Sequence, residues 1–293
     1  MAPGPTGLRI TRALARRFDG RSETSLDPDL RVFVSDLVRP HGLPLREDLL
    51  AEGVGHSYEE LAVGPLREAL AEDEPADLLI LAFDTPDVRP GAPSSLALSR
   101  SVPGSPLAFA VCDQGGAAAF TALRLAAAHQ RTGTCRRAVV VLAEQTALHY
   151  EPPGPVPLPE RHAVVVLVCE EAPGEGLAVR QARGAACPAE AVRAEAEGLG
   201  PRAALLLGPG LGSGSGLGSG PGRGTGSGPG HGTGSGADRT ARPGAGASAP
   251  AQPFTGLWAE LAEHLPRWRA EGRPALLAGY DRRLGVLSTL ALP

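Results

Sequence analysis

The sequence of 293 residues contains no lysine and no asparagine, so all 28 of its Lys and Arg positions are arginine. Without lysine, the protein cannot use an amine as a general base or form a Schiff base with a carbonyl substrate. Without asparagine, no such side chain can orient a catalytic histidine or donate a hydrogen bond to an oxyanion. These two absences exclude whole classes of catalytic mechanism.

Cysteine is scarce, and long apolar runs are absent. Cys112, Cys135, Cys169 and Cys187 are far apart and form no C-x-x-C pair, which favours neither a zinc site nor a disulfide scaffold. No apolar run reaches the roughly 18 residues that a membrane span needs, and the N-terminal segment does not resemble a secretory signal. The net charge of −4 gives no basic footprint for nucleic acid. We therefore expect a cytoplasmic protein that binds neither nucleic acid nor membrane.

One segment of low complexity divides the sequence. From Gly208 to Gly236 every even-numbered residue is glycine. Such a segment cannot bury enough apolar surface to offset its conformational entropy, so we expect a disordered linker rich in Gly, Ser and Pro over 208–250. The sequence thus predicts an N-terminal region over 1–207 and a C-terminal region over 251–293. The second region is too small to fold alone and is expected to pack onto the first.

Before the linker, strand-like runs alternate with helical patterns. The segment 57–73 has an apolar face and a Ser57/Glu60 capping box, which predict a helix, and a second helix is predicted over 116–133. Continuous apolar runs predict strands that are covered on both faces. The predicted strands are 30–38, which alternates, then 76–83, 106–112, 136–144 and 161–171, with an edge strand at 176–185. This alternation is typical of a layered α/β fold.

After the linker, an amphipathic helix is predicted over 254–272. Its two tryptophans, Trp258 and Trp268, recur with the leucines of the apolar face, so we expect them to pack rather than to stack on a ligand. Two apolar runs joined by a polar turn over 273–293 predict a terminal hairpin, and 201–211 predicts a strand beside it.

The stretch FAVCDQGGAAAF, residues 109–120, contains the most informative turn. An apolar strand stops at Asp113 and Gln114, and an alanine-rich helix begins after two glycines. A strand, a tight turn and a helix form the arrangement on which α/β enzymes mount a nucleophile, because the helix N-terminus stabilises an anion. The residue at this turn is a glutamine, which is not a nucleophile.

With these segments in this order, the chain resembles the thiolase-like superfamily, especially the ketoacyl synthase III branch of condensing enzymes. The resemblance covers most of 75–185 and 254–292. It implies a thiolase-like layered α/β/α fold whose shortened second half is interrupted by the Gly-rich linker. It also implies a nucleophilic cysteine at the turn before the buried helix, a position that falls on Gln114 or on its neighbour Gly115. Chain-length-factor subunits of type II polyketide synthases carry glutamine there, and they shape the cavity of an active ketosynthase without forming a carbon–carbon bond.

Four further residues are candidates for chemistry near this turn. Cys112 is two residues before Gln114, on the same face of the strand, and is either a displaced nucleophile or a core residue. Asp113 is either a catalytic acid or base or a cap of the helix. His149 and His162 flank the loop after a strand, where sites of α/β folds gather, and they are the candidate bases.

Two functions from different classes follow. The first is a degenerate, non-elongating condensing-enzyme homologue of polyketide or fatty-acyl metabolism. The resemblance implies that it would pair with a ketosynthase or an acyl carrier protein, as a homo- or heterodimer joined through 106–112. The missing lysine and asparagine favour this function. The second is an acyltransferase that uses Cys112 or Asp113 with His149 or His162. It would take its acyl group from acyl-CoA or a phosphopantetheinyl carrier protein, and neither function requires a bound cofactor or metal.

Overall fold

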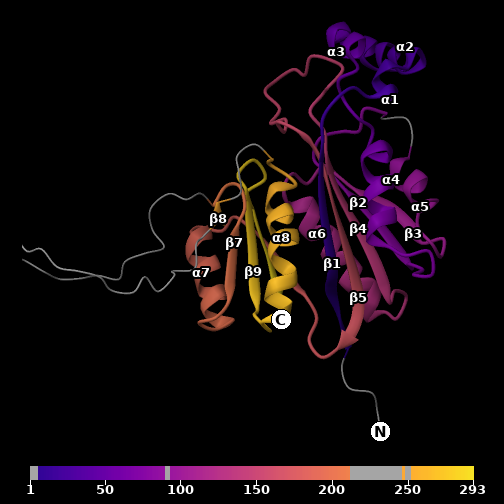
Figure 1. Cartoon of the computed structure of the whole chain (residues 1–293). Coiled ribbons are helices and arrows are strands. Elements are labelled where there is room, and N and C mark those ends of the chain that lie inside the picture. The colour runs from indigo at the N-terminus through magenta and orange to yellow at the C-terminus, as the bar shows by residue number, and fades with distance from the viewer. Residues whose placement is uncertain (1–5, 90–92, 212–245, 248–251) are drawn as a thin grey trace, which may run out of the picture.

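The computed structural model describes residues 6–89, 93–211, 246–247 and 252–293, which form two five-stranded sheets (Figure 1). The first sheet has the order β1-β5-β4-β2-β3, and the second has the order β6-β10-β9-β7-β8. The first-sheet strands are β1 (Thr6–Phe18), β2 (Leu78–Ala82), β3 (Leu107–Val111), β4 (Arg137–Glu144) and β5 (His162–Pro173). The second-sheet strands are β6 (Ala178–Arg183), β7 (Ala204–Leu207), β8 (Gly246–Ala247), β9 (Ala275–Asp281) and β10 (Val286–Leu292). Most of the predicted linker lies outside the described residues.

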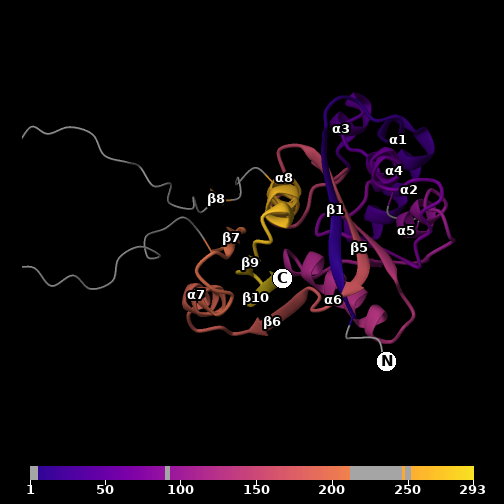
Figure 2. The same ribbon diagram turned by 60° about the horizontal axis from the view of Figure 1, so that its bottom comes forward.

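Helices lie between the sheets and on their outer faces. α6 (Ala117–Arg131) and α8 (Gly256–Ala270) each contact strands of both sheets and form the central layer (Figure 2). The outer face of the first sheet is covered by α4 (Tyr58–Ala69) and α5 (Ser94–Ser99), and α7 (Pro188–Gly198) lies against β9 of the second. The remaining helices are α1 (Glu23–Leu26), α2 (Pro28–Val38), η1 (Arg39–His41) and α3 (Glu47–Glu52). Within the described residues, no helix is long and apolar enough to cross a membrane.

Burial on both faces of β2 confirms the prediction made for that strand. Leu78 and Ile80 point into the cluster between the two sheets, whereas Leu79 and Leu81 point into the cluster under α4. All four side chains are at most 1% exposed. β2 pairs in parallel with both β3 and β4, so the N–H and C=O groups of its backbone are hydrogen-bonded. Its side chains can therefore be apolar on both faces.

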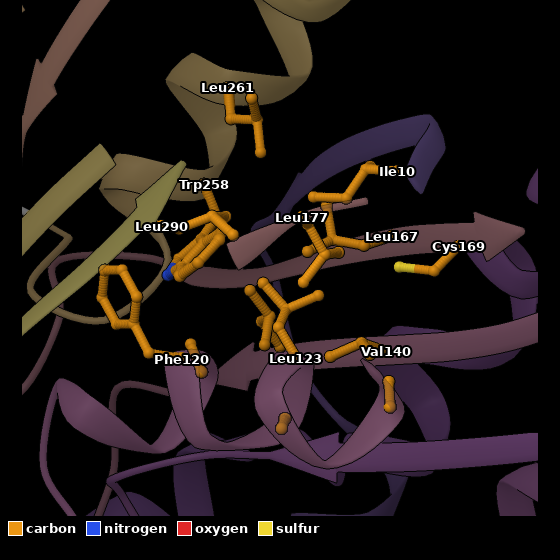
Figure 3. Packing of buried hydrophobic residues seen from close by; sticks show 14 of the residues in the cluster. Ile10, Phe120, Leu123, Val140, Leu167, Cys169, Leu177, Trp258, Leu261 and Leu290 are labelled. Atoms are coloured by element: carbon orange, nitrogen blue, oxygen red, sulfur yellow. The ribbon is translucent and has the colours of Figure 1, made fainter. Parts of the chain in front are cut away.

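The alanines of α6 explain how two sheets approach one helix. Ala118, Ala119, Ala122 and Ala126 are fully buried, and their small side chains let the flanking elements come close. The larger side chains fill the space toward α8, where the rings of Phe120 and Trp258 meet edge to face with centroids 5.0 Å apart (Figure 3). The central core is therefore built by residues from both ends of the sequence.

The prediction of a strand over 30–38 is wrong, because these residues form helix α2. Leu30, Val34 and Val38 are its buried side chains, and their spacing of four places them on one helical face. Asp27 caps the helix, accepting a hydrogen bond from the amide of Asp29, and Pro28 occupies the first turn, where its missing N–H costs nothing. The Asp27 cap and Pro28 therefore favour a helix here, although apolar and other residues alternate as in a strand.

The strand predicted over 106–112 exists as β3, but the prediction that both its faces are covered is wrong. Among the described strands, β3 pairs only with β2 and forms an edge of the first sheet. Leu107 is 57% exposed. An apolar run therefore does not by itself distinguish a central strand from an edge that a partner could cover.

Other predicted elements are confirmed. α4 begins with the Ser57/Glu60 capping box, β9 and β10 form the terminal hairpin, β7 lies beside β9, and β6 is an edge strand. The sequence pattern missed β1, in which arginines interrupt the apolar residues. It also missed the short helices around it and α7.

Candidate functional site

The turn between β3 and α6 has an unusual backbone. Asp113 has φ of 60°, in the left-handed region that non-glycine residues seldom adopt. Gly115 follows with φ of 52°, and the carbonyl of Gln114 accepts a hydrogen bond from the amide of Ala117 at 3.0 Å. The chain therefore reverses sharply at these residues and delivers the first turn of α6 to a cavity between the sheets.

The N-terminus of α6 is occupied by a carboxylate from the far end of the sequence. Asp281, at the end of β9, accepts a hydrogen bond from the Gly116 amide at 3.1 Å through Oδ2. Its Oδ1 accepts from the amide of Leu284 at 2.9 Å, which fixes the side chain in the hairpin turn. A Cβ atom at Gly115 would lie 1.8 Å from Asp281 Oδ2, so only glycine allows this approach. The negative charge lies where the helix dipole favours an anion.

The side chain of Gln114 is held by a chain of polar groups. Its Oε1 accepts a hydrogen bond from the Thr121 hydroxyl at 2.7 Å. Gln181 of β6 donates to Thr121 Oγ1 and to the carbonyl of Ala117, both at 3.1 Å. The Gln114 amide is therefore tied to the first turns of α6 and to the second sheet.

A cavity of about 820 Å³ opens beside this turn. Gly116, Ala117 and Phe120 of α6 line one side, and Phe254, Leu257 and Trp258 line the other. The prolines of the loop after β4 close part of the wall: Pro152, Pro153, Pro155 and Pro157. Among the described residues that line this cavity there is no cysteine and no histidine, so neither a thiol nor an imidazole faces it. Its walls are suited to holding an apolar chain.

The charges at the mouth of the cavity are paired with one another. Arg283 approaches Asp84 at 3.4 Å, and the backbone N–H of Gly115 also donates a hydrogen bond to the Asp84 carboxyl. Burial raises the pKa of Asp84, and the carboxylates of Asp281 and Asp113 act in the same direction, while Arg283 opposes them. Within the described residues, no three side chains are arranged as a metal site.

Solved structures share the fold of this protein over nearly the whole chain. A 3-oxoacyl-(acyl-carrier protein) synthase from Burkholderia xenovorans matches with a TM-score of 0.58 and 14% identity, covering 99% of this chain and 95% of that one. A tetronic acid condensing enzyme, AbyA1, matches with a TM-score of 0.55 and 15% identity, covering 98% and 100%. The acyltransferase ChlB3 matches with a TM-score of 0.56 and 14% identity, covering 97% of each chain. The chain has the thiolase-like fold.

Similarity in sequence gives no comparable match. No protein-family model matches the chain, and no curated protein is similar to it. The thiolase-like fold is therefore shown by the two sheets and their central helices. In this fold the resemblance identified from the sequence implies a nucleophile at Gln114, and the structure has this residue at the turn that leads into α6.

Cys112 and Asp113 lie together at the end of β3, outside the cavity. The Cys112 thiol donates to Asp113 Oδ2 at 3.3 Å. Burial raises the pKa of this thiol, and its contact with the carboxylate raises it further. A thiol in such surroundings holds little of the thiolate that nucleophilic attack needs.

His149 and His162 are buried in other surroundings. His149 Nε2 lies 2.8 Å from the carbonyl oxygen of Val54, and burial lowers its pKa. His162 begins β5 and packs against His56 with ring centroids 4.4 Å apart. Burial and the neighbouring histidine lower the pKa of His162 to about 4. Neither ring lines the cavity beside α6, and neither does Gln114. The two rings contact Val54, Thr146 and His56, and no described contact joins either of them to Gln114.

Sequence reasoning missed Glu144, the last residue of β4, which caps α8. This side chain is 1% exposed. Its carboxylate accepts hydrogen bonds from the amides of Phe254 and Thr255 at 3.0 and 3.1 Å, and from Gln252 Nε2 at 2.8 Å. The Thr255 hydroxyl donates to it as well. An acidic residue at the end of a buried strand was the signal in the sequence, but its partners lie more than 100 residues later.

Proposed function

We propose that this protein is a non-elongating condensing-enzyme homologue that serves as a partner subunit of an active ketosynthase. The observation that carries the proposal is the start of α6, where Gln114 stands in place of a nucleophile and Asp281 occupies the helix N-terminus. Both features oppose covalent acylation. An amide does not attack a thioester, and a resident carboxylate disfavours the second negative charge that a thiolate or an oxyanion would bring.

The cavity supports a role in shaping or holding an acyl chain. Its walls come largely from aromatic, leucine and proline side chains, and its mouth charges neutralise each other through the Asp84–Arg283 contact. A neutral, extended acyl chain would lose little by leaving water for such walls. The absence of any lysine or asparagine in the sequence also favours binding without condensation.

The exposed edge of the first sheet supports the partner in this proposal. β3 has a free edge among the described strands, and the exposed side chains of Leu107 and Leu96 lie on β3 and on the adjacent α5. Edge strands with exposed apolar residues are normally covered in stable proteins. We propose that β3 pairs edge to edge with the ketosynthase subunit, and that a homodimer is the alternative outcome.

A carrier protein would approach the same assembly at the hairpin turn. Arg283 of this turn is 70% exposed, and Arg282 beside it donates to the Gly210 carbonyl at 3.4 Å and has no ion pair among the described residues. Acidic surfaces are steered toward such arginines. The hairpin turn is therefore the proposed contact for an acyl carrier protein.

The second candidate function is acyl transfer without condensation, which the partial exposure of Cys112 beside the turn favours. Intact-mass measurement after incubation with acyl-CoA and acyl-carrier-protein thioesters separates the two functions. We expect no adduct on the wild type or on Cys112→Ala, together with co-purification of a co-expressed ketosynthase. A stable acyl adduct on the wild type that is lost in Cys112→Ala would overturn the partner-subunit proposal and identify an acyltransferase.

Substitution of β3 tests the pairing independently. Leu107→Arg places a charge on the exposed edge, and we expect it to abolish co-purification with the ketosynthase while leaving the fold intact. Val32→Arg is the matched control, because Val32 is equally exposed, at 57%, but lies on α2 and not on β3. Equal retention of the ketosynthase by both variants would contradict pairing through β3.

A further inference from the structure

A second cavity, of about 270 Å³, lies at the other end of α8. Its floor is apolar and comes from Ile10 of β1, Leu265 and Trp268 of α8, and Leu292 of β10. These four side chains are buried, with exposures of 4% to 8%. Trp268 follows Trp258 by ten residues, or about 15 Å along the helix, so the two cavities lie at opposite ends of one element.

Three arginines surround this floor. Arg9 donates through Nε to the carbonyl of Glu175 at 3.0 Å, and Arg273 donates through Nε to the carbonyl of Arg202 at 2.7 Å. Arg269 donates to the carbonyl of Thr11. Each guanidinium is thus anchored by a neutral backbone acceptor that positions it but does not neutralise its charge.

No carboxylate of the described residues lies within ion-pair distance of these three arginines. In the part of the chain that the structure describes, Arg9, Arg269 and Arg273 form no ion pair. By contrast, Arg12 contacts Glu74 at 2.7 Å and Arg137 contacts Glu170 at 2.7 Å. The sequence has 32 acidic residues against 28 arginines, so acidic residues are not in short supply. The observation specific to this cavity is that three such arginines line one apolar hollow.

The acidic residue nearest in sequence makes its hydrogen bond outside the cavity. Glu271 lies between Arg269 and Arg273, and its carboxylate accepts a hydrogen bond from Arg267 Nε at 2.7 Å. Arg273 attracts the same carboxylate at longer range, without an ion pair within 4 Å. Arg267 is on the same helix and does not line the cavity. The cavity therefore combines an apolar floor with a positive rim whose guanidinium groups retain free N–H donors.

We propose that this cavity binds a small amphiphilic anion, in which a carboxylate or phosphate group is attached to a short hydrocarbon or aromatic group. Guanidinium groups bind both anions through paired N–H donors, and Ile10, Leu265 and Trp268 would cover the apolar part. The volume suits a small molecule rather than a long acyl chain, since pockets for drug-sized ligands begin at roughly 300 Å³. This site is separate from the cavity at α6 and does not depend on the function proposed for it.

The two tryptophans provide a direct test. Trp258→Phe leaves Trp268, on the floor of the second cavity, as the only tryptophan in the chain. Its fluorescence would be titrated with octanoate and with octyl phosphate, each below its critical micelle concentration. The controls are octanol, octylammonium and inorganic phosphate. We expect saturable changes with the two amphiphilic anions, a much weaker response to inorganic phosphate, and none with octanol or octylammonium.

Arginine variants test whether the guanidinium groups of the rim bind the anion. We expect Arg269→Gln and Arg273→Gln each to weaken binding about tenfold or more, because each removes a charged donor. Arg124→Gln is the matched control, because Arg124 is an exposed arginine on α6 that does not line the cavity, and it should leave the affinity unchanged. Isothermal titration of the wild type and the arginine variants with the same two anions repeats the test without the Trp258 substitution. Binding of octanol as tight as that of octanoate, or equal losses in all three variants, would overturn the proposal. The comparison of octanoate with octyl phosphate identifies the preferred anion.

Discussion

The two central helices begin at the same cavity, and each receives a carboxylate from a distant element, but the two carboxylates differ. Glu144 at the start of α8 is 1% exposed and accepts four hydrogen bonds, one of them from a side-chain amide. Asp281 at the start of α6 is only half-buried and accepts one hydrogen bond from that helix, through the amide of Gly116. The first joins the two halves of the core. The second lies where a ligand would otherwise reach the helix.

The largest effect is expected from Glu144→Gln. The substitution keeps the size of the side chain but turns an NH2 group toward amides that can only donate, and it removes the charge that they solvate. We expect a loss of about 2–4 kcal/mol in the free energy of unfolding, measured by urea denaturation. Glu263→Gln, on the exposed face of α8, is the control and should change it by less than about 0.5 kcal/mol. A loss no larger than that of the control would show that Glu144 does not hold the two halves together.

A smaller effect on the free energy of unfolding is expected from pH. It acts through His162, which lies beside Glu144 at the same end of the paired strands β4 and β5. Its pKa is lowered from 6.5 to about 4, so the folded protein keeps this ring neutral where the unfolded chain binds a proton. The stability contribution is therefore present above pH 6.5 and is lost as the pH falls toward about 4. The expected loss is on the order of 2 kcal/mol, measured by denaturation at a series of pH values. His162→Gln should flatten this dependence, and an unchanged slope in that variant would assign the effect to other groups.

The third prediction concerns the chemistry that Asp281 suppresses. In Gln114→Cys, the new thiol lies at a helix start whose positive end is already occupied, so it should react slowly with iodoacetamide. Adding Asp281→Asn removes the negative charge and should lower the thiol pKa by about one unit, raising the alkylation rate near neutral pH several-fold. Cys112→Ala and Cys187→Ala in both backgrounds remove the two competing thiols that are not buried. Equal rates in the two variants would mean that Asp281 does not control this site.

The smallest effect is expected from Asp281→Asn alone. This substitution removes a charge from one partly exposed helix cap, so the free energy of unfolding should fall by only about 0.5–1 kcal/mol. Denaturation beside Glu144→Gln gives the comparison directly. A loss as large as that of Glu144→Gln would contradict the distinction between a core connection and a replaceable cap.

Much of the fold could be predicted from local pattern. The continuous apolar runs at β2, β4 and β5 identified central strands, because such sequences are typical of strands buried on both faces, although the edge strand β3 shares the pattern. α2 was mistaken for a strand because Leu30, Val32 and Val34 recur at every second position, and this alternation masks the helical spacing of its buried residues. β1 was missed because it is an edge strand that carries arginines.

Only part of the candidate site could be predicted from the sequence, because local patterns do not reveal contacts between distant residues. The turn at Gln114 is a local feature, so its strand, glycines and helix could be recognised in the sequence. Asp281 meets Gly116 across 165 residues, and Glu144 meets Phe254 across 110. Nothing in the local pattern specifies such pairs, because they arise from the packing of one sheet against the other. The sequence therefore located the turn but not the carboxylates at the two helix starts.

The order of strands in the second sheet has a consequence for how the chain acquires its structure during synthesis. β9 and β10 occupy central positions in that sheet, between β6 and β7, although they are made after all the other strands. Until the ribosome has released them, β6 and β7 have no neighbour between them, and the cavity lacks the wall that α8 provides. The first sheet can assemble early, whereas the second closes in a single late step that joins distant segments. Stalled translation would therefore leave a folded half beside an open apolar surface, a form that chaperones and proteases recognise.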